Sequence, residues 1–215
     1  MKTPVLILLS LLMRLTCFGQ ELEFSSSLNT STEKRFQNAY GIGLQYQQNV
    51  GSKYKIGFGI HYNFNNVKFD EIPYIDGDPN LIVADEIHAI SKRFSIRLNI
   101  QRLLKNNDNA SISLGPEVSY NYLWGQDQIK ERQIETSITY YNYSRSIDLT
   151  KDFGVGLISK VEVKSFLIPK ISLCLTIRPE LLIGKDLFSK GSNPIFSGGL
   201  GFTEFQIGLK YRFKK

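Results

Sequence analysis

The side chains best suited to proton transfer in this chain are its two histidines, His61 and His88. His88 lies in the segment DEIHAISKR, close to Asp85, Glu86 and Ser91. These residue types are the components of a triad of nucleophile, base and carboxylate. A working triad would make the chain an enzyme, but the spacing supplies no geometry for one. We therefore interpret both histidines as ordinary polar residues.

A metal site is not predicted either, because two histidines at unrelated positions are a poor zinc site. The acidic segment DEIPYIDGDPN, residues 70–80, has oxygen ligands for weak Ca²⁺ binding, yet its spacing differs from that of an EF-hand loop. We predict no catalytic residue, no cofactor and no metal, and do not expect an enzyme.

Charged residues that alternate with glycine and small hydroxyl residues form a larger group. They have the parity of one face of a strand, and opposite charges enclosed together are expected to pair. We predict a structural ionic network of Arg97, Glu117, Lys160, Glu162, Arg178, Glu180, Glu21, Glu23, Lys210 and Arg212. Within it, Arg97 is expected to pair with Glu117, and the acids of the first strand with the bases of the last. A gated ion pathway or a ligand cage is the functional alternative.

The elements that carry these residues are predicted to be strands. In YKIGFGIHYNF, residues 54–64, apolar and aromatic residues fall on one parity, and glycine, Lys55, His61 and Asn63 fall on the other. The same alternation recurs in seven further stretches, and no stretch has a helical period. The eight predicted strands are Glu21–Asn29, Ala39–Gln48, Tyr54–Phe64, Lys92–Leu103, Ser111–Trp124, Phe153–Val163, Lys170–Gly184 and Thr203–Phe213. Pro116 and Pro179 fall inside strands, where we expect bulges.

The apolar face is predicted to point outward, into lipid. The polar parity combines long charged side chains with many glycines, which suits a crowded lumen better than a solvated surface. Connections after the second, fourth and sixth strands are short and the others are long, as in outer-membrane barrels. The prediction is an all-β fold: a closed, antiparallel, eight-stranded up-and-down transmembrane β-barrel with short periplasmic turns and long extracellular loops.

Aromatic residues gather near the ends of the predicted strands, where amphipathic rings settle at lipid headgroups. We predict lipid-interface positions for Tyr54, Tyr62, Phe64, Tyr120, Tyr122, Trp124, Phe153, Tyr211 and Phe213. The segment QIETSITYYNYSRSIDLTKDF, residues 133–153, continues the alternation, so the fifth and sixth strands are expected to extend outward as a hairpin. Its predicted tip, Tyr140–Ser144, is rich in tyrosine, which suits either a recognition surface or a solvated extension.

The first 19 residues resemble a secretory signal peptide, with Lys2 before an apolar run that ends near Met13. We divide the chain into a signal peptide, residues 1–19, and a barrel domain, residues 20–215, exported to the outer membrane of a Gram-negative cell. The net charge is +6, but the sequence contains no run of basic residues, which argues against nucleic-acid binding.

Signal peptide, alternating strands and the C-terminal FQIGLKYRF together resemble the small outer-membrane β-barrel proteins of Gram-negative bacteria. Gln20 directly after the signal resembles the PorT-like branch. The resemblance implies contact with outer-membrane lipid and lipopolysaccharide, and insertion by the barrel-assembly machinery through Phe205–Phe213. It implies a structural or interaction role, with a secretion or envelope protein as a possible partner. A narrow channel or an accessory component of a protein-secretion machine is one alternative, and a lipid-modifying outer-membrane enzyme built on His88 is the other.

Overall fold

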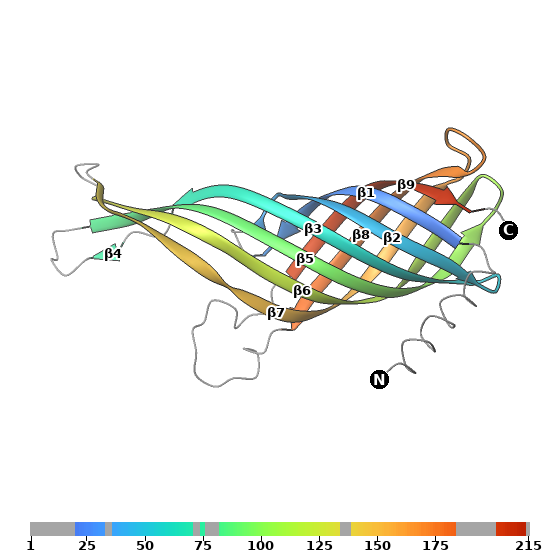
Figure 1. Ribbon diagram of the computed structural model, residues 1–215, viewed down its shortest axis with the longest axis horizontal. Coiled ribbons are helices and arrows are strands. Elements are labelled where there is room, and N and C mark those ends of the chain that lie inside the picture. Colours follow the sequence, from blue (N-terminus) through green and yellow to red (C-terminus); the bar gives the residue numbers. More distant parts are fainter. Residues whose placement is uncertain are drawn as a thin grey trace, which may run out of the picture.

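The computed structural model describes residues 20–32, 36–70, 74–75, 82–133, 139–183 and 201–213. The predicted signal peptide lies outside these residues. Strands make up almost all of the described chain (Figure 1). They are β1 (Gln20–Ser31), β2 (Ala39–Val50), β3 (Tyr54–Asp70), β4 (Tyr74–Ile75), β5 (Ile82–Asn106), β6 (Ala110–Gln133), β7 (Thr139–Val163), β8 (Ile171–Ile183) and β9 (Gly201–Arg212).

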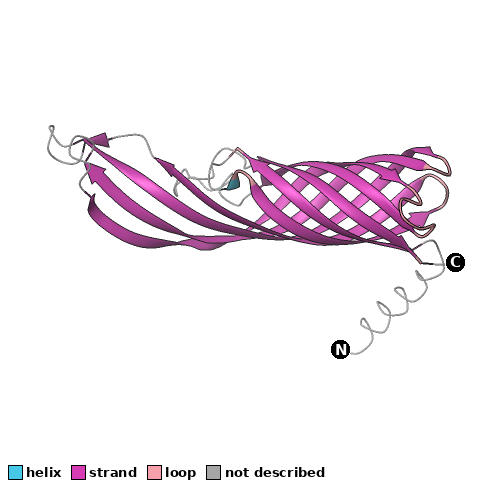
Figure 2. Ribbon diagram, turned by 90° about the horizontal axis from the view of Figure 1, so that it is seen from above, coloured by secondary structure: helices cyan, strands magenta, loops and turns pink. Residues whose placement is uncertain are grey.

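Eight of these strands close into a ring. Each strand pairs antiparallel with its neighbour in the order β3-β2-β1-β9-β8-β7-β6-β5, and β3 pairs with β5 to complete the circle. The two-residue β4 adds only to the outer part of β5. Figure 2 shows the barrel from the side, with the start of β1 and the end of β9 at the same end. The predicted closed, up-and-down, eight-stranded barrel is therefore confirmed. No described helix is long and apolar enough to cross a membrane.

The alternation along β3 sorts its side chains as predicted. Tyr54, Phe58 and Phe64 are exposed on the outside, while Lys55 and His61 are buried in the lumen. The same division holds in β1, β8 and β9, whose burial alternates residue by residue. The apolar residues therefore cover the outside of the barrel, and its interior is polar.

The exposed apolar belt has the height of a bilayer core. Phe64 lies ten steps along the strand from Tyr54, which at about 3.3 Å per step and a tilt of about 40° span about 25 Å along the barrel axis. Outer-membrane barrels carry an apolar band of about that height between two girdles of aromatic side chains.

Four strands run far beyond this belt. β5, β6 and β7 hold 25, 24 and 25 residues, whereas β1 and β2 hold 12 each. Figure 1 shows the outer parts of β5, β6 and β7, with the end of β3, as a twisted sheet beyond one mouth of the barrel. We call this sheet the blade. The predicted outward hairpin of the fifth and sixth strands is thus confirmed as the outer parts of β6 and β7.

The blade corrects two boundaries drawn from the sequence. Part of the long connection expected at residues 70–86 is strand, because the pairing of β3 with β5 continues to Asp70 and Glu86. Tyr140–Ser144 are not the tip of the hairpin but belong to β7, where Tyr143 pairs with Ile129. The connection between β6 and β7, and most of the acidic segment 70–80, lie outside the described residues.

The expectation of bulges at the two prolines is wrong. The register shifts lie elsewhere in β5, β6 and β7, whereas the ladder at Pro116 and Pro179 is interrupted without a shift. A glycine accompanies each interruption: a Cβ on Gly115 would meet the Ile100 carbonyl oxygen at 1.8 Å, and one on Gly156 the Pro179 carbonyl oxygen at 2.4 Å. The neighbouring backbones therefore approach closely beside each proline, at a position where only glycine fits.

Candidate functional site: a filled lumen beneath a protruding sheet

The lumen contains ion pairs at successive levels, and the level nearest the termini is the densest. Glu21 on β1 and Glu162 on β7 share the cations around them. Lys55 Nζ lies 2.9 Å from Glu21 and 3.4 Å from Glu162, and Lys210 Nζ lies 2.8 Å from Glu21 and also binds Glu162. Arg212 contacts both acids from the rim. Five charges from four strands thus close this end of the barrel.

The middle level is made of two pairs joined by an amide. Lys160 on β7 binds Glu23 on β1, and Arg178 on β8 binds Glu117 on β6. The Gln45 side-chain oxygen accepts hydrogen bonds from both cations, at 2.6 Å from Arg178 and 3.5 Å from Lys160. The two pairs are therefore one connected network across the lumen.

The level nearest the blade is dominated by arginine. Arg97 on β5 reaches Glu204 on β9 at 2.5 Å and lies 3.5 Å from Glu180 on β8. Arg93 also binds Glu180. His61 lies beside Glu204, with 3.5 Å between its Nδ1 and a carboxylate oxygen. All five side chains are buried, which places His61 as a lumen-filling residue of this network.

The structure brings nine of the ten predicted network residues into the lumen and Arg212 to its rim, and it corrects one pairing. Arg97 binds Glu204 and Glu180, while Glu117 binds Arg178 and accepts a 3.1 Å hydrogen bond from Asn99. The register of neighbouring strands suggested the pair Arg97–Glu117, but an arginine side chain is long enough to cross a narrow lumen. The expected pairing of acids on the first strand with bases on the last is present as Glu21 with Lys210.

Three members of the network were missed. Lys55, Arg93 and Glu204 all lie within predicted strands and on the polar parity. Applying the alternation to every residue of those strands would have found them. The network thus combines the bases Lys55, Arg93, Arg97, Lys160, Arg178, Lys210 and Arg212 with the acids Glu21, Glu23, Glu117, Glu162, Glu180 and Glu204.

An apolar cluster covers the network at the mouth nearest the blade. Phe36 lies between β1 and β2 and packs with Leu123 of β6, Leu182 of β8 and Phe202 of β9, all nearly inaccessible. The guanidinium carbon of Arg93 lies 4.1 Å from the centre of the Phe202 ring, a cation–π contact that links cluster and network. Strand alternation gave no indication of this cap.

Glycines on the lumen face make room for larger side chains. A Cβ on Gly43 would stand 2.3 Å from Nδ1 of His61, and one on Gly41 would stand 1.7 Å from the side-chain oxygen of Asn63. Each glycine on β2 pairs with the residue it accommodates on β3. The glycines predicted to leave space in the lumen therefore have identified neighbours.

The residues around His88 do not assemble into a triad. Strand alternation places His88 and Glu86 on one face of β5, and Asp85 and Ser91 on the other. His88 instead contacts the side-chain oxygen of Asn66 at 2.5 Å. Within the described ranges, no group of three or more His, Cys, Asp or Glu side chains is arranged to hold a metal ion.

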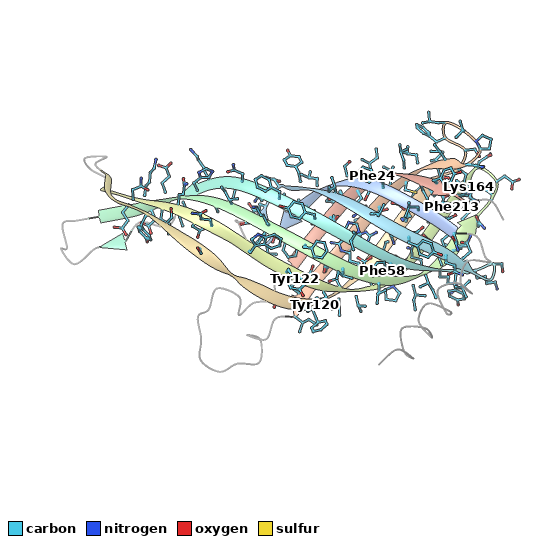
Figure 3. The ribbon with its side chains drawn as sticks, viewed as in Figure 1. Phe24, Phe58, Tyr120, Tyr122, Lys164 and Phe213 are labelled. Atoms are coloured by element: carbon cyan, nitrogen blue, oxygen red, sulfur yellow. The ribbon has the colours of Figure 1, made fainter. Side chains whose placement is uncertain are left out.

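The predicted interface aromatics lie on the outside of the barrel. At the level of the blade's base, Tyr120 packs edge-on against Tyr122 with ring centres 5.0 Å apart and also contacts Phe153 at 5.1 Å. At the opposite end, the rings of Tyr211 and Phe213 are 5.2 Å apart. Figure 3 shows these two levels, with Phe58 between them. Their contact with lipid remains a prediction.

The sequence of the chain matches no family model and no curated protein. Its fold, however, matches solved structures. A major outer membrane protein of Thermus thermophilus superposes with a TM-score of 0.52 at 12% identity, covering 90% of this chain and 99% of that one. Neisserial surface protein A gives 0.48 at 8% identity, covering 90% and 97%. OprG of Pseudomonas aeruginosa gives 0.44 at 12% identity, covering 92% and 97%.

The match to the Thermus protein and the ring of strands define the class of the protein by its fold: the eight-stranded barrel found in outer-membrane proteins. Identities this low support the fold alone. The resemblance to the PorT-like branch stays a prediction.

Proposed function

We propose that the chain is an integral outer-membrane protein. The side chains that fill its lumen stabilise the barrel, and the blade, on the cell surface, is its interaction surface. One contrast carries this proposal: the barrel interior is occupied by connected ion pairs beneath an apolar cap, while β5, β6 and β7 extend well beyond the membrane belt. The polypeptide outside the belt is therefore the part available to partners.

The network argues against the narrow-channel alternative. Arg97 and Glu204 join β5 to β9, which are opposite strands of the ring, and Lys160 and Glu23 join β7 to β1. A permeating ion would have to separate such pairs and then pass the cluster around Phe202. Small barrels of this strand number are normally filled by side chains.

The alternative of a lipid-modifying enzyme loses its support, because His88 lies on one face of β5 and Asp85 and Ser91 lie on the other. An accessory role in a secretion machine is compatible with the proposed function, since it requires a surface rather than an open lumen. Lipopolysaccharide and an envelope protein are the partners we propose for that surface.

The topology is tested by labelling intact Gram-negative cells that express the chain with a membrane-impermeant maleimide. In a Cys174→Ser background, Ser144→Cys on the exposed part of β7 is expected to react in intact cells. Asp108→Cys, in the short turn between β5 and β6, should react only after the outer membrane is permeabilised. Reaction of both in intact cells, or of neither, would contradict the proposal.

A further inference from the structure

The turn between β7 and β8 is unusual among the short turns at the end that carries the termini. The other two are polar: Gly51–Lys53 joins β2 to β3, and Asn107–Asn109 joins β5 to β6. The β7–β8 turn instead presents three consecutive apolar side chains. Phe166, Leu167 and Ile168 are 49%, 66% and 50% exposed.

The turn is held in a fixed shape. The Phe166 N–H donates to the Ile171 carbonyl oxygen at 2.9 Å, and the Ile171 N–H to that of Ile168 at 2.9 Å. Pro169 occupies the second position of this tight turn, where its fixed φ is favourable. Ser165 at the base adopts a φ of 55°. The three apolar side chains are therefore presented by an ordered turn, at a small entropic cost for binding.

The base of the turn is joined to its neighbours. Lys164 donates a 2.6 Å hydrogen bond to the Asn106 side-chain oxygen and another to the Asn107 carbonyl oxygen. The Arg212 N–H donates to the Lys170 carbonyl oxygen at 3.0 Å, which ties the other side of the turn to β9. Figure 1 shows the turn standing clear of the barrel wall, and Figure 3 labels Lys164 and Phe213 at this end.

The surface around the turn is basic. Outside the lumen, the described residues of this rim include one acid, Asp108, and the bases Lys53, Arg102, Lys105, Lys164 and Lys170. Burial, together with the charge of Arg212, lowers the pKa of Lys164. Lys170 lies 5.8 Å from the centre of the Tyr211 ring, so its charge stands at the aromatic edge of the lipid-facing belt.

Apolar side chains flanked by lysines and continuous with a lipid-facing belt have the chemistry of an interfacial anchor. The apolar groups enter the boundary of the acyl chains, and the ammonium groups attract acidic headgroups. We propose that the β7–β8 turn, Lys164–Lys170, binds anionic phospholipid in the periplasmic leaflet. This inference rests on the proposed function, because it requires that the barrel be inserted in a membrane.

The test uses one tryptophan at a time, in a Trp124→Phe background, with the protein refolded into phosphatidylcholine vesicles that contain phosphatidylglycerol. Leu167→Trp reports the tip of the turn. Asp108→Trp, in the polar turn, is the matched control, and Phe58→Trp reports insertion of the barrel itself. Each indole is challenged with brominated acyl chains and with aqueous iodide.

The indole at position 167 is expected to emit at shorter wavelength than that at 108, to lose most of its emission to brominated chains, and to resist iodide. Quenching should be stronger when the bromine is carried by phosphatidylglycerol than by phosphatidylcholine. That preference should disappear in the variant Lys53→Gln/Lys105→Gln/Lys170→Gln, which keeps Lys164 and its hydrogen bonds.

Iodide quenching at 167 equal to that at 108 would overturn the proposal. Protection from iodide only in native outer-membrane fragments would also overturn it, in favour of a protein partner. Equal quenching from both brominated lipids would overturn the selectivity for anionic phospholipid. If the indole at position 58 escapes brominated chains, the barrel is not inserted, and the proposed function fails rather than the anchor.

Discussion

Arg97 and Glu204 meet at 2.5 Å across the full width of the barrel, from strands that are diametrically opposite in the ring. Neither side chain is accessible to solvent. Each carries a charge that is costly to bury without its partner. The pair therefore ties together two walls that no backbone hydrogen bond connects.

Removing one member of this pair should strongly destabilise the barrel. Arg97→Ala leaves Glu204 with an uncompensated buried charge, so the free energy of unfolding should fall by about 3–5 kcal/mol. Urea titration in lipid vesicles measures it. The double variant Arg97→Met/Glu204→Leu should recover most of the loss, whereas Lys105→Ala on the exposed rim should change stability by no more than about 0.5 kcal/mol. A fall for Lys105→Ala as large as that for Arg97→Ala would contradict this account.

The alternation of residue types was sufficient to predict the barrel. In β3 the parity of Tyr54 to Phe64 determines which side chains face outward, and closure of the eight strands follows because an open sheet edge in lipid would leave backbone groups unpaired. Alternation alone does not say which face points outward, because a soluble barrel would place the apolar face inside. The combination of charge and glycine on the polar parity indicated that the polar face lines the lumen.

The partners within the lumen could not be predicted in the same way. Register predicts neighbours on adjacent strands, yet Arg97 pairs with Glu204, 107 residues away in the sequence. Such a contact depends on the stagger and diameter of the closed barrel. The cap has the same origin, since Phe36 and Leu123 come together only when the ring closes.

Gly43 should be intolerant of a side chain because His61 occupies its space. Gly43→Ala is expected to reduce the free energy of unfolding by about 1–3 kcal/mol through overpacking. In Gly43→Ala/His61→Ser the smaller neighbour should relieve part of that cost, so the two changes would be less than additive in a double-mutant cycle. Strict additivity would show that the His61 ring does not fill the space beside Gly43.

A charge on the lipid face should cost more at mid-height than at the rim. Phe58→Arg is expected to destabilise the barrel by about 2–4 kcal/mol and Tyr54→Arg by about 0–1 kcal/mol, since the penalty depends on depth in the bilayer. Equilibrium unfolding from vesicles compares the two directly. Equal costs at the two positions would place the bilayer elsewhere on the barrel.

Cys174 reports whether the lumen is accessible to water-borne reagents. Its side chain is fully buried on the lumen face of β8. A small cationic methanethiosulfonate should therefore react with it only after unfolding, while Asp108→Cys in a Cys174→Ser background should react at once. Rapid reaction of Cys174 in the folded protein would indicate an open, water-filled pathway.

The apolar face of this barrel is expected to contact lipid. Electrophoresis of unboiled and boiled samples, after refolding from urea with and without lipid vesicles, measures whether folding requires that contact. We expect a faster-migrating folded band that appears only with lipid and is lost on boiling. A folded, monomeric protein recovered in buffer without lipid or detergent would show that the apolar face does not need lipid.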